Sequence, residues 1–375
     1  MTSRRTLATG IGSAVIAALA LGACGSPAPT PSQPPAVAVA VASPSAPTPS
    51  PSPSPSATAT AVPSPSAPID PTTADLTGVT TDPALAHRLP LAVLLDDNRI
   101  ARPQSGFNGA SIVYQAPADG GETRYMFVFQ EGDSAEIGPV RSARVYFVHW
   151  ASEIKAAIAH YGGDLRSRQY LASFDHQRFT DVDALGRGGK AYHRIASREA
   201  PHNGYTSTTA LRAMAGKLGG PASEPADLYH RTFVAPGGPD SLPTSQRIRV
   251  PYRTGVIEYR FDRGTDLYRR SVDGKSQLDP ADGKGVTTRN VVVLFMSFKT
   301  DTKIEPGHSR PVIGLIGTGR AMIFREGRLT EGTWSKANEQ APTRLLDKTG
   351  DEIPLVTGRT FFQIVPLDTR ITVGS

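Results

Sequence analysis

The sequence predicts an α+β protein with a mixed, layered N-terminal domain over residues 71–225 and a β-rich C-terminal domain over residues 226–375. Three observations lead to this fold class. Residues 26–68 consist almost wholly of Pro, Ser, Ala, Thr and Val, without a single charge. Helix-like and strand-like segments then follow one another up to residue 225. From about Leu228 onward, short apolar runs alternate with turn signals, which is typical of strands and hairpins.

The N-terminus has the pattern of a bacterial lipoprotein signal peptide. Arg4 and Arg5 give a positive region, and a short apolar run over residues 7–21 leads into the sequence Leu-Gly-Ala-Cys. Cleavage before Cys24 would remove residues 1–23 and leave that thiol for lipidation, for example with palmitate. The arginine pair also loosely fits a twin-arginine signal, so both the Sec and the twin-arginine export routes stay open.

Cys24 is the only cysteine of the chain. The chain therefore forms no intramolecular disulfide, and it has no thiol nucleophile once this residue is acylated. Two acyl chains are enough for stable membrane anchoring. We expect residues 24–70 to be a lipidated cysteine followed by a disordered tether, because a proline-rich segment without charges cannot bury enough apolar surface to offset the entropy of ordering. The folded part would then lie on the outer face of the cytoplasmic membrane.

The charge of the chain argues against nucleic acid as a partner. The formal net charge is +6, and removing a signal peptide with two arginines and no acidic residue lowers it to +4. This excess is small for an exported chain of this length. An anionic wall polymer, lipid head groups or another envelope protein are the partners that the sequence suggests.

The N-terminal domain contains apolar runs of strand length and segments with helical periodicity. Residues 125–130 are apolar and aromatic throughout, which predicts a strand buried on both faces. A helix is expected after Ser142, whose hydroxyl is a suitable N-cap, and another over residues 207–218 with Ser207 as its cap. The other expected strands are residues 89–95 and 110–115, and the other expected helix is residues 164–173.

The C-terminal domain is expected to consist of strands joined by tight turns. Residues 273–274, 326–327 and 349–351 contain Asp-Gly, Glu-Gly and Thr-Gly-Asp turn signals. Residues 279–283 begin like a calcium loop but lack the remaining ligands, so we expect a turn there as well. The expected strands are residues 256–261, 267–272, 291–295, 321–324 and 361–365.

A basic turn before the first helix is the candidate anion site. Arg141 and Arg144 flank Ser142 at the expected helix entrance, and Arg124 follows a glycine pair shortly before. Basic side chains oppose the helix dipole at that end. A bound anion would reverse this penalty, because free amides and guanidinium groups would both point at it. We therefore predict an anion site formed by these four residues, with Arg102, His202 and Asn203 as further ligand-binding candidates.

Further candidate residues lie in other turns. Asp96 and Asp97 follow an apolar strand, where paired acids can bind a metal ion, act in acid-base chemistry or cap a turn. Arg102 lies in the next turn, and His202 and Asn203 follow a proline that could place an imidazole in a cleft. The alternative for all the candidate residues is an internal network of ion pairs that fixes these loops. No other metal site is predicted.

Six short motifs follow one another in a fixed order. They are Ala-Arg-Pro-Gln-Ser-Gly (101–106), Ile-Val-Tyr (112–114), Gly-Gly-Glu-Thr-Arg (120–124), Gly-Pro-Val-Arg-Ser-Ala-Arg (138–144), His-Tyr-Gly-Gly (160–163) and Ala-Pro-His-Asn (200–203). Together they resemble the YerB-like lipoprotein family, which is named for a domain of unknown function. The resemblance covers essentially the whole chain after the tether, and it implies a lipid-anchored envelope protein without an assigned activity.

The chain departs from the family pattern at three places. Residues 115–119 stand where the family more often has an acidic, apolar run, Asp164 where a serine is common, and Phe361 where a tryptophan is common. The first departure argues against a role for an acid at position 115. The C-terminal region resembles the family at residues 268–270, 290–293 and 334–336.

Two functional hypotheses remain. The sequence has no GxSxG elbow, HExxH helix or GxxxxGK[ST] loop, so we expect no cofactor and a non-catalytic envelope module that binds an anionic ligand or wall polymer. The alternative is an enzyme acting on a lipid-diphosphate-linked or other phosphorylated wall precursor. The order of strand, turn and arginine-bearing turn is locally similar to the LytR-CpsA-Psr enzymes, which transfer wall polymers from such carriers. Arg124, Arg141 and Arg144 would then clamp a diphosphate, and Asp96 would position a metal ion or proton transfer.

Overall fold

A computed structural model describes residues 70–225, 228–237, 245–303 and 305–374. The signal peptide, Cys24 and the tether, all predicted from the sequence, lie outside the described residues. The described residues belong to one compact unit that spans residues 65–375. Within this unit, none of the described helices has the length and apolar character needed to span a membrane.

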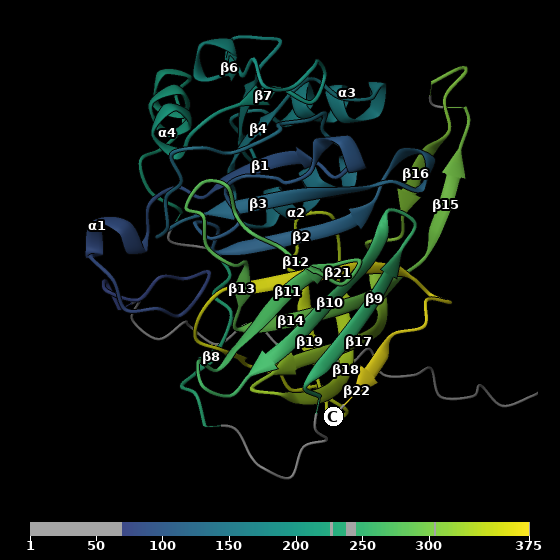
Figure 1. The fold of residues 1–375 in the computed structure, drawn as a ribbon. Coiled ribbons are helices and arrows are strands. Elements are labelled where there is room, and N and C mark those ends of the chain that lie inside the picture. The colour runs from purple at the N-terminus through teal and green to yellow at the C-terminus, as the bar shows by residue number, and fades with distance from the viewer. Residues whose placement is uncertain (1–69, 226–227, 238–244, 304, 375) are drawn as a thin grey trace, which may run out of the picture. The chain divides into compact units, whose positions relative to one another are not determined.

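A ten-stranded mixed sheet is the centre of the fold (Figure 1). Its strand order is β19-β18-β17-β14-β21-β2-β3-β1-β4-β5. β2 pairs with β3 on one side and with β21 on the other, so strands from both predicted domains share one sheet. The domain boundary after residue 225 stays a prediction. The strands are β1 (Leu91–Asp96), β2 (Ile112–Pro117), β3 (Thr123–Phe129), β4 (Ala157–His160), β5 (Thr180–Asp183), β14 (Asn290–Met296), β17 (Gly317–Arg325), β18 (Arg328–Lys336), β19 (Arg344–Leu346) and β21 (Thr360–Pro366).

Both faces of this sheet are covered, which explains why its central strands are continuously apolar. One face packs against α2 (Val145–Glu153) and α3 (Leu165–Phe174). The other packs against α4 (Thr208–Lys217) and a second sheet. Every residue of β3 is buried, which confirms the strand expected over residues 125–130. The layered α+β arrangement predicted from the sequence is thereby confirmed.

The second sheet has the order β12-β11-β10-β9-β22, with β13 beside β11. Ile248, Ile257 and Tyr259 lie in the core, while Arg249 and Arg260 on the same strands are exposed. This sheet and the late strands of the large one confirm the predicted β-rich C-terminal region. Its strands are β9 (Arg247–Tyr252), β10 (Gly255–Asp262), β11 (Leu267–Val272), β12 (Lys275–Ser276), β13 (Thr287–Thr288) and β22 (Thr372–Gly374).

The remaining elements are short. They are α1 (Pro83–Ala86), the 3-10 turns η1 (Arg99–Ala101), η2 (Asp119–Gly121) and η3 (Gly189–Ala191), and the strands β6 (His193–Arg194), β7 (Gly204–Tyr205), β8 (Phe233–Val234), β15 (Phe298–Asp301), β16 (Arg310–Ile313) and β20 (Leu355–Val356).

The helix caps differ in how well the sequence predicted them. Ser207 caps α4 as expected, since its hydroxyl accepts from the backbone N of Ala210 at 3.2 Å. The cap predicted at Ser142 is wrong, because α2 begins at Val145 with Arg144 as its N-cap and no capping side chain. The segment before α2 stays extended because its backbone is bonded elsewhere, for example from Arg141 N to Leu94 O at 2.7 Å.

Candidate functional site

The predicted arginine site lies at the carboxyl ends of two parallel strands. β1 and β4 are parallel neighbours, so the loops that follow them meet at one edge of the sheet. Asp96 ends β1 and lies directly opposite Arg124 of β3. The backbone bond from Arg141 to β1 brings that residue to the same place. Three of the predicted side chains, Asp96, Arg124 and Arg141, therefore meet here.

Asp96 is the centre of this group. Its Oδ2 accepts from Arg141 Nε at 2.8 Å and lies 2.8 Å from His202 Nδ1. Burial raises the pKa of Asp96, but Arg124 and Arg141 outweigh it and hold the pKa below its ordinary value. Asp96 is thus charged at neutral pH and holds the imidazole of His202 by one nitrogen. An imidazole held in this way has the arrangement of a general base.

Arg144 pairs with a different carboxylate, that of Asp119. The same carboxylate oxygen lies 3.8 Å from Arg124 Nη2 and 3.2 Å from Arg310 Nη1. Arg144 Nε also lies 3.6 Å from Asp164 Oδ2. Burial, together with the neighbouring Arg144, lowers the pKa of the Arg124 guanidinium to about 10.

These contacts make the predicted arginines part of an ion-pair network. Every arginine of the network has a carboxylate neighbour within the network, and Arg310 has an additional one in Glu305 at 2.5 Å. Its arginines are Arg124, Arg141, Arg144 and Arg310, and its acids are Asp96, Asp119, Asp164 and Glu305. Because the charges balance, an anion would have to compete with an existing pair. Anion binding by Arg124, Arg141 and Arg144 stays a prediction.

The other predicted residues have separate partners. Ser142 joins the network through its backbone carbonyl, which accepts from Arg124 Nη1 at 3.1 Å. Asn203 accepts from Arg194. Asp97 accepts from Arg102 Nε at 2.8 Å, on the side of the sheet away from Asp96. The two adjacent acids therefore do not converge on one point.

A second group of arginines, which the sequence analysis missed, lies on the outer face of the second sheet. We call Arg247, Arg260 and Arg269 the arginine ladder. Arg260 of β10 is paired with Arg247 of β9 on one side and with Arg269 of β11 on the other. Their side chains are 43%, 63% and 64% exposed. Like charges directly opposite one another destabilise a sheet, so this row is costly without a counter-charge.

Three acids, Glu258, Asp262 and Asp273, offset only part of this charge. Glu258 bonds to Arg247 Nη2 at 2.7 Å and to Arg260 Nε at 2.8 Å, and it lies 3.5 Å from Nε of the neighbouring Arg249. Burial of the carboxylate raises the pKa of Glu258, but Arg247 and Arg260 outweigh this effect and hold the pKa below its ordinary value. Asp262 pairs with Arg269. An open groove of about 640 Å³ on this face is lined by five arginines and by the carboxylates of Glu258 and Asp273, so the arginines outnumber the three acids near them.

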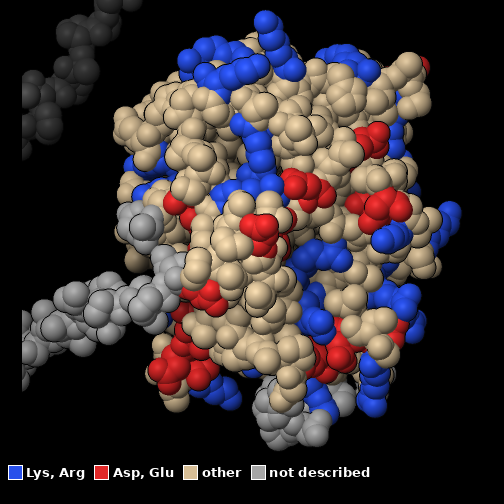
Figure 2. All heavy atoms as spheres, turned by 90° about the vertical axis from the view of Figure 1, so that its left-hand side faces the viewer, with Lys and Arg blue, Asp and Glu red and all other residues tan. Residues whose placement is uncertain are grey.

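The face shown in Figure 2 carries charges of both signs. Lys and Arg side chains gather along its upper part, while Asp and Glu side chains lie mainly in its middle and lower parts, beside further Lys and Arg side chains.

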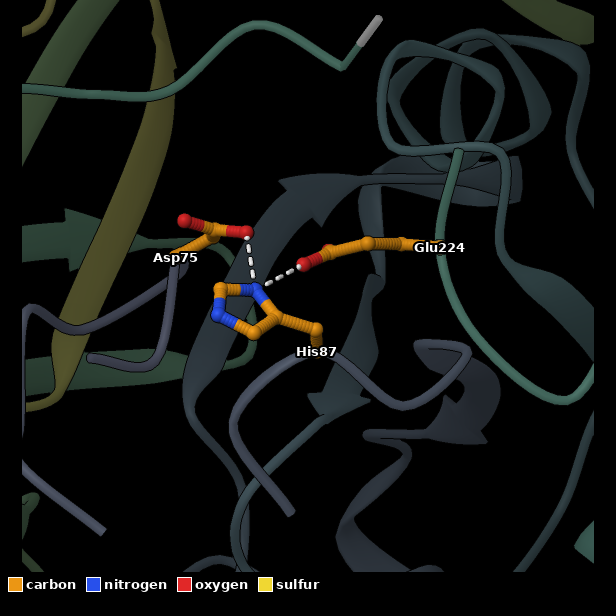
Figure 3. A group of neighbouring side chains, drawn as sticks. All are labelled: Asp75, His87 and Glu224. Atoms are coloured by element: carbon orange, nitrogen blue, oxygen red, sulfur yellow. Dashed lines mark hydrogen bonds and ion pairs between the residues drawn. The ribbon is translucent and has the colours of Figure 1, made fainter. Parts of the chain in front are cut away.

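One further group of side chains in the described part of the chain is close enough to share a metal ion. It consists of Asp75, His87 and Glu224, which converge from distant parts of the chain (Figure 3). None of these three residues was predicted from the sequence to be a site residue.

Two family models match this chain. The model described as "Protein of unknown function (DUF3048) N-terminal domain" matches residues 76–220, and the corresponding C-terminal domain model matches residues 248–362. The chain belongs to the YerB-like DUF3048 family. The resemblance drawn from the six sequence motifs is thereby confirmed.

Two comparisons place the chain within the YerB-like family. It is 31% identical over 302 residues to "Putative lipoprotein YerB" of Bacillus subtilis (strain 168), which covers 78% of this chain and 86% of that protein. It is also similar to the crystal structure of the YerB protein from Bacillus subtilis, with a TM-score of 0.69 and 28% identity over 80% of this chain and 99% of that one. The ion-pair network lies mainly in the region that matches the N-terminal family model. The arginine ladder lies at the start of the region that matches the C-terminal family model.

Proposed function

We propose that this protein is a lipid-anchored binding module of the cell envelope that recognises an anionic polymer through the arginine ladder. The observation that carries the proposal is the row formed by Arg247, Arg260 and Arg269 across three adjacent strands. The row is exposed, and acids offset it only in part. A bound anion would attract all three guanidinium groups and so offset the repulsion between them.

The number of arginines favours a polymer over a single small anion. Adjacent strands lie about 4.8 Å apart, so the ladder presents several guanidinium groups along one line. A hydrogen bond to a charged group contributes roughly 1.5 to 3 kcal/mol, whereas association costs at least about 4 kcal/mol. One arginine cannot overcome that cost, and three can. A chain of repeated phosphate groups can engage all three, because guanidinium and phosphate match in geometry.

The proposed location rests on two independent supports. The N-terminal motif that ends in Cys24 is typical of lipoproteins, and the similar Bacillus subtilis protein is named a lipoprotein. A lipid on Cys24 would anchor the chain to the outer face of the cytoplasmic membrane. The tether would then let the folded unit reach polymers of the wall layer.

A second candidate function is an enzyme that acts on a phosphorylated wall precursor. The observation that favours it is the pair of Asp96 and His202 at the carboxyl end of β1, beside Arg141. His202→Gln tests it: an enzyme would lose turnover of a lipid-diphosphate substrate, while a binding module would keep its affinity for the polymer.

The ligand class is tested by titrating the protein with three partners under equal conditions. These are a linear glycerol-phosphate polymer, a neutral polysaccharide of similar length, and vesicles rich in phosphatidylglycerol. We expect binding of the phosphate polymer that weakens as salt is added, since exposed charges are screened within about 10 Å at 0.1 M salt. Preference for the vesicles would shift the proposal to a lipid surface, and equal binding of the neutral polymer would refute it.

A further inference from the structure

We propose that Asp75, His87 and Glu224, with His230 beside them, form a binding site for a divalent transition-metal ion, with zinc as the best match. His87 Nδ1 lies 2.8 Å from Asp75 Oδ2 and 2.9 Å from Glu224 Oε1 (Figure 3). His230 Nδ1 lies 2.8 Å from the other carboxylate oxygen of Asp75. Asp75, His87 and Glu224 thus converge on one point, and His230 lies beside them, against the other oxygen of Asp75.

The orientation of the His87 ring favours a cation at this point. Its Nε2 lies 3.0 Å from the backbone carbonyl oxygen of Asp70, to which an Nε2 proton donates. In a neutral ring this leaves the lone pair on Nδ1, facing two carboxylate oxygens. Such an arrangement is repulsive unless a proton or a metal ion lies between the three atoms. Metal-binding histidines are commonly fixed in the same way, by a hydrogen bond from the other ring nitrogen to a carbonyl.

His230 supplies an independent observation. Its Nδ1 lies 2.8 Å from Asp75 Oδ1 as an ion pair, and its buried Nε2 has no hydrogen-bond partner among the described residues. An imidazole nitrogen this close to a carboxylate oxygen is stabilised when a proton or a metal ion lies between the two atoms. Asp75 and His230 also line a cavity of about 470 Å³, which gives an ion and its water access to the group.

The ligands are held by the surrounding structure. Glu224 Oε2 accepts from Gln130 Nε2 at 2.6 Å, and Glu224 N donates to His87 O at 2.9 Å. Ala74 N donates to Val79 O at 2.9 Å, which closes the turn that carries Asp75. The metal ion would therefore connect the beginning of the folded unit to the segment that follows α4.

The ligand set selects the class of ion. An imidazole nitrogen combined with two carboxylate oxygens suits zinc and similar transition metals, whereas magnesium and calcium prefer oxygen alone. In a tetrahedral zinc site with bonds of about 2.0 to 2.1 Å, ligand atoms lie about 3.4 Å apart. The observed distances of 2.8 and 2.9 Å would have to widen by about 0.5 Å, which small side-chain rotations provide.

The test is metal binding by the purified protein after treatment with a chelator. We expect the wild type to bind one zinc ion per chain and no magnesium, and its melting temperature to rise with zinc and fall again with chelator. Glu224→Gln and His230→Ala should each weaken zinc binding at least about tenfold, since even outer-shell changes have effects of that size. The matched control is His308→Ala, which removes an exposed histidine and should leave the affinity unchanged.

A second measurement on the wild type covers the case in which these variants fail to fold. Cobalt added to the stripped protein should give the visible absorption of a four-coordinate ion with nitrogen and oxygen ligands, and zinc should displace it. Absence of stoichiometric zinc binding, or equal zinc affinity in the folded variants and the wild type, would overturn the proposal and leave a proton as the only cation at His87. A cobalt spectrum of a fully hydrated ion would do the same.

Discussion

Asp96 and Asp97 are neighbours in the sequence but face opposite sides of the ten-stranded sheet. Asp96 lies on the side of α2, where it binds Arg141 and His202. Asp97 lies on the side of the second sheet, where it accepts from Arg102 and Gln115. The alternation of a strand separates the two carboxylates into different environments, and each of them holds an arginine in place.

Asp97→Asn should strongly destabilise the fold. Asp97 is fully buried, and its two oxygens accept from Arg102, Gln104, Gln115 and Thr123. Asparagine would place an amide group among these donors and leave a largely buried guanidinium without its charge partner. We expect a loss of about 3 kcal/mol in the free energy of unfolding, measured by denaturant titration. The exposed Asp368→Asn is the control, and a loss of similar size in both variants would contradict the account.

Asparagine substitution of Asp96 or Asp97 is a poor test of catalysis. Asparagine substitutions at the two acids would lower activity through the fold, whether or not the protein is an enzyme. His202→Gln is the better test, because His202 makes a single described contact with the acid pair, through Asp96.

His149 should make the protein sensitive to acid. This histidine of α2 is 8% exposed, and neither ring nitrogen makes a hydrogen bond with the described residues. Burial, with smaller effects of charged neighbours, lowers its pKa to about 4. The neighbours are Glu339, which acts in the opposite direction, and Lys336, Arg166 and Arg178.

The pH effect arises because His149 binds a proton more readily in the unfolded chain than in the folded chain. The unfolded chain takes up a proton on His149 near pH 6.5, while the folded chain resists it down to about pH 4. Stability is therefore complete above about pH 6.5 and falls by about 3 kcal/mol as the pH drops to about 4. His149→Phe should remove this part of the pH dependence, measured by urea unfolding between pH 4 and 8. An unchanged pH profile would show that His149 is not buried as a neutral ring.

Glu258→Gln should separate stability from binding at the arginine ladder. Removing this carboxylate leaves Arg247 and Arg260 without their shared partner, so stability should fall by up to about 1 kcal/mol, and less at high salt. Affinity for a phosphate polymer should rise, because one opposing charge is removed. Calorimetry on the variant and the wild type measures both effects. A lower stability with unchanged polymer affinity would indicate that the ladder is only part of the architecture.

The strands of the large sheet were predictable because burial on both faces leaves a continuous apolar run. The segment now seen as β3 is the clearest case. The start of α2 was not predictable from the sequence. Ser142 has the right chemistry for a helix cap, but its segment is held extended by backbone hydrogen bonds to β1 and to the loop after β4. At this position, hydrogen bonds to distant segments override the capping propensity of Ser142.

The candidate sites were predictable only in part. The sequence indicated that Arg124 and Arg141 would meet, but not that Asp119 would neutralise their neighbour Arg144. The alternation of Arg247, Ile248 and Arg249 is a visible sign of an exposed basic strand face. The ladder itself depends on the register between β9, β10 and β11, which residue spacing does not reveal.

The central claim is that the arginine ladder binds an anionic polymer, and one comparison tests it most directly. Binding of a glycerol-phosphate polymer is measured by calorimetry for the wild type, for Arg260→Gln with Arg269→Gln, for Arg141→Gln, and for the exposed control Arg344→Gln. The account predicts a loss of at least about tenfold for each ladder arginine removed, because each contact contributes about 1.5 kcal/mol or more. It predicts little change in the other two variants. The claim would be contradicted if the ladder double variant kept the wild-type affinity and Arg141→Gln lost it. That result would indicate that the anion site lies in the loop before α2.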